Sequence, residues 1–243
     1  SYMGESLQAK YPSIKSYTGI RSDQKGSVRF SVSSLGLHAM IFDVTGKTYY
    51  IDPYTKDGLN YTLYSKSELS RSKKAFHCET EESISANKEK KSARGKVATD
   101  GKLRTFRLAL GCTGEYAQFH LTDQGIPDSA SDVEKKTAVL SAMYVTLTRI
   151  NAIYERELAL TLELVANNDQ LVFLNPATDG LTNNNVRSML NEIQEICDAN
   201  IGFLKYDVGH VFARGNSSGI AELGSPCTNR KAQGVTRTNL PKG

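Results

Sequence analysis

The stretch SDVEKKTAVLSAMYVTLTRINAIYERELALTLELVA, residues 131–166, contains a helix followed directly by a strand, and this succession decides the fold. Ser131 and Glu134 have capping-box spacing, in which each side chain accepts a hydrogen bond from the other residue's backbone at a helix start. Apolar side chains then recur at three- and four-residue steps along one stripe: Leu140, Met143, Leu147, Ile150 and Tyr154. The alternating run LALTLELVA, 158–166, predicts a strand.

The same alternation of strands and helices extends in both directions. LRTFRLALGCTGEY, 103–116, predicts a strand before the helix. Residues 185–201 predict a second helix, YDVGHVFA at 206–213 a third strand, and GIAELG at 219–224 a short strand. Strands separated by helices of this length predict an α/β fold with a largely parallel sheet and right-handed crossovers. The short last strand is expected at an edge, in antiparallel orientation.

Residues up to about 69 have a different pattern, in which apolar and polar residues alternate between turn signals. Val28, Phe30 and Val32 fall on one face of a predicted strand, and Met40 and Phe42 follow after a glycine-containing turn. The sequence therefore predicts a small antiparallel β unit here, so that the whole chain is α+β. His38 stands alone in this unit and is interpreted as a core or surface histidine.

Residues 71–102 are polar and charged and contain few large apolar residues. Such a composition cannot bury enough surface to offset chain entropy, so an exposed linker is expected. Lys and Arg are dense between 88 and 96, which favours proteolytic cleavage, and Arg94 in SARGK is the expected position. The segment is either a plain tether or an activation linker, and the isolated Cys78 favours the latter.

Composition excludes some classes of function. The 243-residue chain has 39% apolar and 23% charged residues and a formal net charge of +4, and no apolar run is long enough to span a membrane. No basic face carries interleaved aromatic residues, so a nucleic-acid partner is not expected. The first residues lack the pattern of a signal peptide, which either never existed or has been removed.

Four cysteines, Cys78, Cys112, Cys197 and Cys227, form no CxxC pair. A zinc ribbon or a thioredoxin-type site is therefore not expected. An even count permits two disulfides in an exported protein, and four reduced thiols are the alternative. The sequence leaves this choice open.

A search for catalytic motifs finds none. The chain has no GxGxxG or GxxxxGK[ST] nucleotide motif and no GxSxG nucleophile elbow. Glu155 stands beside Arg156, and a surface or interdomain ion pair is favoured over acid–base catalysis. His210 is interpreted as a core or sheet-edge histidine, and the His77–Cys78 pair alone is weak support for a metal site. No catalytic residue is therefore expected within the chain.

Several stretches resemble the reprolysin-like zinc metallopeptidases of the metzincin clan, especially the secreted bacterial type. They are LRTFRLALGCTGEYAQFH, RINAIYERELALTLELVANNDQLVF, ATDGLTNNN, ANIGFLKYDVGHVFARG and GIAELGSPCTNRKAQGVT, which cover most of 103–236. YPSIKSYTGI, GLHAMIF and YYIDPYTKD resemble the pro-region of the same family. The resemblance implies a β-rich pro-region at 1–70, an activation linker at 71–102 and the N-terminal part of a metzincin-like catalytic domain at 103–243.

In that family an active-site helix with HExxHxxGxxH holds Zn²⁺ through three histidines, and its Glu is the general base. No HExxH occurs in residues 1–243, and the closing stretch KAQGVTRTNLPKG, 231–243, shows no helix or strand pattern. We therefore expect the catalytic helix to follow this stretch, with the zinc ligands outside the chain and the C-terminal half of the catalytic domain as a partner. Without that helix, one face of the sheet should be left uncovered.

The resemblance also implies roles for particular residues. The family's edge strand binds extended substrate backbone, and it matches Gly219, Ile220, Ala221, Glu222 and Leu223. Cys227 matches a cysteine that the family often ties into a disulfide, with Cys197, Cys112 or a cysteine of the missing half as partner. Cys78 is a candidate fourth zinc ligand of a latent zymogen, and a disulfide or an inert thiol is the alternative.

Three functions remain in competition. The first is part of an exported zinc endopeptidase in zymogen form, acting on peptide or protein substrates. The second is an inactive module that binds extended peptides, and the third is an inhibitory role of the β-rich unit. Export and a secreted or cell-surface location follow from the resemblance and the even cysteine count. The sequence determines neither substrate specificity nor disulfide connectivity.

Overall fold

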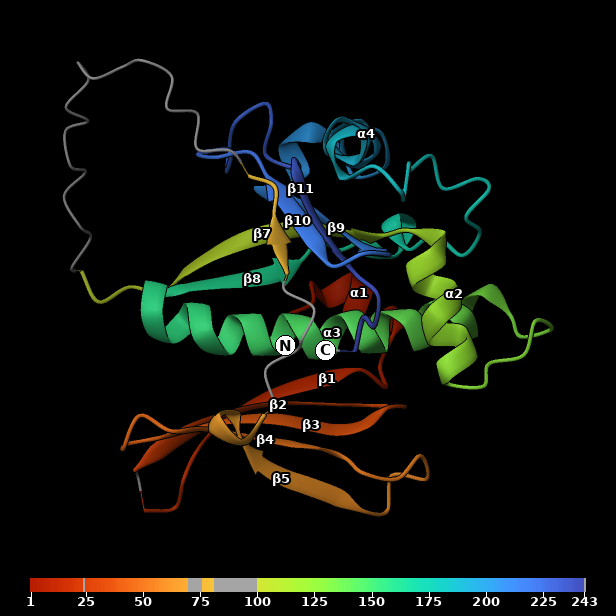
Figure 1. The fold of residues 1–243 in the computed structure, drawn as a ribbon. Coiled ribbons are helices and arrows are strands. Elements are labelled where there is room, and N and C mark those ends of the chain that lie inside the picture. The colour runs from red at the N-terminus through yellow and green to blue at the C-terminus, as the bar shows by residue number, and fades with distance from the viewer. Residues whose placement is uncertain (24, 70–75, 81–99, 243) are drawn as a thin grey trace.

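The computed structural model describes residues 1–23, 25–69, 76–80 and 100–242, and these form two β-sheets and four α-helices (Figure 1). The predicted mixture of α and β elements is therefore confirmed. Most of the predicted linker, including Arg94, lies outside the described residues.

The N-terminal sheet is antiparallel, and its five strands follow one another in chain order. The strands are β1 (Lys15–Ile20), β2 (Gly26–Ser33), β3 (Gly36–Asp43), β4 (Thr48–Pro53) and β5 (Tyr61–Ser65). Short turns join them, as in the hairpin between β3 and β4, where the Asp43 N–H donates to the Lys47 carbonyl at 2.9 Å. The predicted β unit is thus present.

The second sheet has the strand order β6-β10-β11-β9-β7-β8. Its strands are β6 (His77–Cys78), β7 (Arg104–Cys112), β8 (Leu160–Leu164), β9 (Val208–Arg214), β10 (Ser218–Ala221) and β11 (Gly234–Thr238). Strands β8, β7, β9 and β11 are mutually parallel, and β10 is antiparallel to β11. The predicted parallel sheet with a short antiparallel strand is therefore found, but β10 is not the edge strand that was expected, because β6 pairs with its outer side.

Strand β11 corrects the expectation that residues 231–243 contain no regular element. It lies between β9 and β10, inside the sheet. Its sequence GVTRT is short and begins with glycine, so local propensity gives little signal. Strand β11 is stabilised by backbone pairing with β9 and β10, which its own side chains do not predict.

Four α-helices are described: α1 (Glu5–Lys10), α2 (Gly114–Asp123), α3 (Asp132–Leu158) and α4 (Val186–Asn200). The predicted capping box at the start of α3 is formed by Ser131 and Glu134 in both directions. The predicted second helix is α4, which Asn185 caps by accepting from two backbone N–H groups. The sequence does not predict helix α2. The strand that was expected to reach Tyr116 ends at Cys112, and Thr113 then caps this additional helix.

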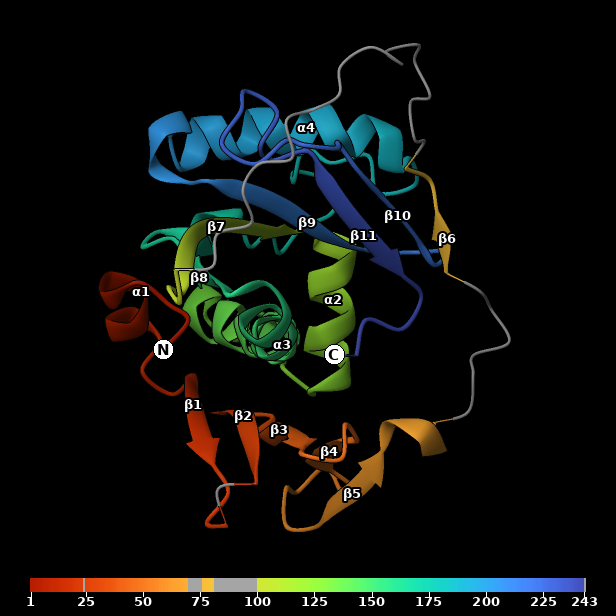
Figure 2. The same ribbon diagram turned by 90° about the vertical axis from the view of Figure 1, so that its left-hand side faces the viewer.

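The elements form layers (Figures 1 and 2). Helix α4 covers one face of the second sheet, α3 lies across the other face, and the N-terminal sheet packs against the far side of α3. Two buried clusters correspond to the two faces of the second sheet: one includes Leu108 and Leu140, the other Val211 and Ile193. Helix α3 thus separates the two sheets and contacts both.

Residues 2–14 belong to the core beneath α3. Tyr2, Leu7 and Tyr11 are buried in the same cluster as α3 and β8. The N–H of Leu164, in β8, donates to the Tyr2 carbonyl at 2.9 Å, and the N–H of Gly4 donates to the Leu164 carbonyl at 3.0 Å. The first residues therefore extend the second sheet beyond β8.

Among the described helices, none combines the length and apolar character needed to cross a lipid bilayer.

Candidate functional site

The strand expected to bind substrate is β10. Gly219, Ile220 and Ala221 lie within it, and Glu222 and Leu223 follow its end. Glu222 still donates its backbone N–H across to the segment before β11, at 2.9 Å, whereas Leu223 is exposed in a turn. The five candidate residues are thus contiguous along one side of the sheet.

The outer side of β10 is occupied by the chain itself. Strand β6 pairs with it in parallel, although residues 71–102 were expected to be an exposed linker. The His77 N–H donates to the Ser217 carbonyl at 3.1 Å, and the Glu79 N–H donates to the Gly219 carbonyl at 2.8 Å. This is β-augmentation within one chain, in which an extended segment uses the main-chain groups that a bound peptide would use.

Glycine at position 219 allows the close approach of this segment. A Cβ there would lie 2.7 Å from the Phe76 ring and 3.1 Å from the Val235 carbonyl oxygen. At the other end of the segment, the Ala221 N–H donates to Thr80 Oγ1 at 3.0 Å. Residues 76–80 therefore follow β10 along its length.

The four cysteines are free in the structure. Cys112 and Cys197 are buried in different clusters, on opposite faces of the second sheet, which separates them. Cys227 is exposed, with a left-handed φ of 63°, and no disulfide joins it to either buried thiol. Cys78, in β6, is exposed as well, and burial raises the pKa of the Cys112 and Cys197 thiols to about 12.

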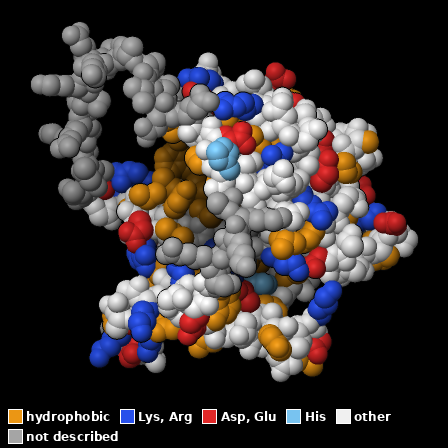
Figure 3. Space-filling model, viewed as in Figure 1, with side chains coloured by type: hydrophobic (Ala, Val, Ile, Leu, Met, Phe, Trp, Pro, Cys, Tyr) orange, Lys and Arg blue, Asp and Glu red, His pale blue; other side chains and the backbone are white. Residues whose placement is uncertain are grey.

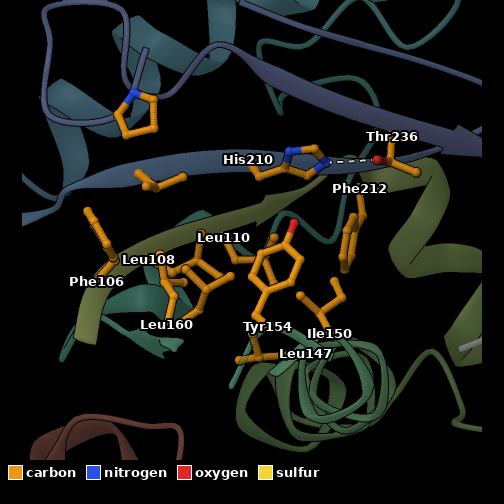
Figure 4. Close-up of a pocket in the computed structure, with 13 residues that line it drawn as sticks. Phe106, Leu108, Leu110, Leu147, Ile150, Tyr154, Leu160, His210, Phe212 and Thr236 are labelled. Atoms are coloured by element: carbon orange, nitrogen blue, oxygen red, sulfur yellow. Dashed lines mark hydrogen bonds between the residues drawn. The ribbon is translucent and has the colours of Figure 1, made fainter. Parts of the chain in front are cut away.

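An apolar cavity of about 380 Å³ lies between α3 and the face of the second sheet that α3 covers (Figures 3 and 4). Strands β7, β8 and β9 contribute Phe106, Leu160 and Phe212, and α3 contributes Leu147 and Tyr154. Figure 4 shows these side chains pointing toward one another across the cavity. The cavity leaves part of this apolar face unfilled although α3 packs on it, and the absence of a covering helix stays a prediction.

His210 is the histidine that lines this cavity, and Thr236 is its hydrogen-bond partner. Its Nε2 lies 2.9 Å from Thr236 Oγ1, and its ring contacts Phe212 edge-on, with the centroids 5.6 Å apart (Figure 4). Desolvation by burial lowers the pKa of His210 to about 4, so the ring is neutral at pH 7. His210 lies in β9, between β7 and β11, so it occupies the interior of the sheet and not an edge.

The described residues do not fit a zinc centre. Within residues 1–23, 25–69, 76–80 and 100–242, no group of three or more His, Cys, Asp or Glu side chains could hold a metal ion. The histidines are dispersed: His38 lies in β3, His77 in β6, His120 in α2 and His210 in β9. No step through zinc is therefore assigned to these residues.

Glu155 of α3 forms an ion pair with the N-terminal sheet, which is the kind of contact that the sequence favours. Its partner is Arg29 of β2, at 2.7 Å, and not the adjacent Arg156. Arg156 pairs with Glu157 at 2.6 Å and lies over the Phe42 ring, 3.9 Å from its centroid. These contacts join α3 to the N-terminal sheet.

Sequence reasoning missed a second polar cluster at the same contact. Asp52 of β4 bonds His38 Nδ1 at 2.6 Å, the Tyr64 hydroxyl at 2.5 Å and the Arg149 guanidinium at 2.5 Å. Burial alone would raise the pKa of Asp52, but the bonds from His38 and Tyr64 and the charge of Arg149 hold it below its usual range. No sequence signal links residues 97 positions apart, so only the fold reveals this cluster.

Comparison with known families gives one match. Residues 140–243 match the family model described as metallo-peptidase family M12B, reprolysin-like. No curated protein sequence matches the chain. The matched segment contains most of α3, all of α4 and the strands β8 to β11, including the strand on which residues 76–80 lie. Over residues 140–243, the chain is similar to the reprolysin-like metallopeptidases.

Proposed function

We propose that the chain is part of an exported zinc-dependent endopeptidase in its zymogen form, and that residues 76–80 cover the strand that binds substrate. The family similarity supports hydrolysis of peptide bonds by zinc-activated water in the parent protein. Many reprolysin-like proteases act outside the cell, which supports export.

The observation that carries the proposal is the pairing of β6 with β10. Substrate backbone would need the main-chain groups of Gly219 to Leu223, and the Gly219 carbonyl already accepts from Glu79 at 2.8 Å. A peptide can use this side of β10 only after residues 76–80 leave. The pairing thus supports a latent form in which the chain's own segment excludes substrate.

In this proposal residues 1–70 are the pro-region, 71–102 the activation linker, with cleavage at Arg94, and 103–243 the N-terminal part of the catalytic domain. The parent would supply the three zinc-binding histidines and the general base from outside residues 1–243, because these residues contain no HExxH sequence. The helix that carries them would pack over the apolar cavity beside His210. Cys78 would be the thiolate ligand that keeps the zymogen latent, and Cys227 would pair with a cysteine of the remaining half.

The test measures casein hydrolysis and zinc content of the full-length precursor. Glu79→Pro removes the N–H that donates to the Gly219 carbonyl, so it should raise latent activity severalfold. Glu79→Ala keeps that N–H and is the matched control, which should leave latency unchanged. Cys78→Ser should also raise latent activity, because it removes the proposed fourth zinc ligand.

Intact mass and zinc content come first. About one zinc per molecule in a species heavier than residues 1–243 would support the peptidase proposal. A precursor that binds no zinc and cleaves no casein, with or without Glu79→Pro, would contradict it.

The second candidate is a non-catalytic peptide-binding or inhibitory module derived from a metallopeptidase. The observation in its favour is that β10 already pairs with an extended segment, residues 76–80. This candidate predicts that Glu79→Pro increases binding of a fluorescent extended peptide to β10 without any cleavage of that peptide.

A further inference from the structure

The N-terminal sheet has an unusual distribution of polarity between its two faces. The face that packs against α3 carries charged and polar side chains, with Arg29 on Glu155 and His38 and Asp52 near Arg149. Met40 and Phe42 are the apolar residues buried there, together with Ala152 of α3. This inner face is therefore a mixed, largely polar contact.

The opposite face is more apolar than the packed one. Strand register places successive residues on alternate faces, so residues paired with Val28 and Phe30 share the face directed away from α3. Two adjacent rows on this outer face are Val28, Ile41 and Tyr49, then Phe30, Ile51 and Leu63. Tyr17 of β1 stacks on Phe30 with ring centroids 5.0 Å apart.

Nothing among the described residues covers this outer face. The sheet is the last layer of the molecule, with α3 on one side and no described helix or strand on the other (Figures 1 and 2). Leu63 is 64% exposed and Tyr17 45% exposed. A groove of about 440 Å³ crosses the face, with Val28, Ile41 and Leu63 in its lining. Contiguous apolar surface of this kind is typical of an interaction site.

We propose that the outer face of the N-terminal sheet binds the same face of a second copy of this chain. Two sheets pack face to face at about 10 Å, so two copies related by a twofold axis would interdigitate these rows. Five strands spaced about 4.8 Å apart, each contributing about six residues at about 3.4 Å, give a face of about 490 Å². Pairing two faces buries on the order of 1,000 Å², near the lower limit for specific association.

The lack of charged side chains in the two rows favours a second copy of the chain over a charged partner. The two rows contain no ionisable group except the Tyr49 phenol. At the rim, Arg21 pairs with both Asp43, at 3.1 Å, and Asp23, at 3.0 Å. The two apolar rows can therefore pair with the same rows of a second copy without charge repulsion between them. The modest area makes the expected dimer weak and dependent on concentration.

Sedimentation velocity of the chain from low to high micromolar concentration tests this. The wild-type chain should shift from monomer toward dimer as the concentration rises. Leu63→Glu and Leu63→Arg, which place opposite charges on the outer face, should each raise the dimer dissociation constant at least about tenfold, or 1.4 kcal/mol. Leu204→Glu is the matched control, since Leu204 is 81% exposed but lies outside this sheet.

Circular dichroism and urea unfolding establish that each variant is folded. A wild-type chain that remains monomeric at every concentration would overturn the proposal. A dimer that Leu63→Glu and Leu63→Arg leave intact would overturn it too. So would a monomeric chain that binds phosphatidylcholine vesicles through Leu63, because the face would then contact lipid.

Discussion

Asp52 joins the N-terminal sheet to α3 through three side chains, His38, Tyr64 and Arg149. Asp52→Asn removes the charge that Arg149 faces and should lower the free energy of unfolding by about 1–3 kcal/mol at pH 7. Urea denaturation followed by circular dichroism measures this. Asp57→Asn, in an exposed turn where the carboxylate accepts from the Thr55 hydroxyl and the Leu59 N–H, should change stability much less.

The pH dependence at Asp52 has a definite sign. Because the folded-state pKa of Asp52 lies below its unfolded value of about 3.9, its contribution to stability is present above that pH and is lost as the pH falls further. The stability difference between the wild type and Asp52→Asn should therefore shrink from pH 7 toward pH 2. A difference that stays constant over this range would contradict the assignment.

At the scale of elements, β7 is held by a side chain that imitates a neighbouring strand. The Leu110 N–H donates to Asn168 Oδ1 at 2.8 Å, and Asn168 Nδ2 donates to the Leu110 carbonyl at 2.9 Å. Asn168→Leu leaves both buried backbone groups without these partners and should cost about 2–4 kcal/mol. Asn184→Leu, at an exposed position, should cost no more than about 0.5 kcal/mol. Urea unfolding of both variants distinguishes the two results.

Elements with strong local signals were predictable, and those stabilised by distant partners were not. The capping box and apolar stripe of α3 act within a few residues of each other, so the sequence predicts the helix and its start. Strand β11 depends on pairing with β9 and β10, which local propensity does not report. For the same reason the sequence predicts a linker where β6 forms, since the pairing of β6 with β10 joins residues about 140 positions apart.

The candidate site was predictable in part: the sequence indicates its strand but not the segment that covers it. The family resemblance indicates residues 219–223 as the segment that binds substrate, and this role remains a proposal. Its coverage by residues 76–80 could not be predicted, because the polar composition of 71–102 favours exposure. The Glu155 ion pair was anticipated in kind, but its partner Arg29 follows only from the packing of the N-terminal sheet on α3.

For the whole molecule, cleavage between residues 81 and 99 should not by itself separate the two parts. Tyr2, Leu7, Tyr11 and Ile14 are buried in the core with α3, and each fully buried side chain of this size contributes about 1.5–3 kcal/mol. A chain cut at a protease site inserted in this range should elute from size-exclusion chromatography as one species at native pH.

The same sample should give two fragments on a denaturing gel, which establishes that cleavage is complete. Separate elution of the N-terminal fragment under native conditions would show that the shared core does not hold the parts together. Retention would mean that activation of the proposed zymogen needs a step after cleavage, in which residues 76–80 leave β10.

Helix α3 lies between two sheets, and this position has a consequence for synthesis on the ribosome. Residues 138–145 are all buried, so this part of the helix has no solvent-facing side. The strands that pack on its far side end at Ser65, whereas α3 begins at Asp132. At about 5–20 residues per second, the N-terminal sheet emerges several seconds before its partner helix exists. During that interval α3 is not yet available to bury Met40, Phe42 and the first residues of the nascent chain. This is the stage of synthesis at which a chaperone would be needed.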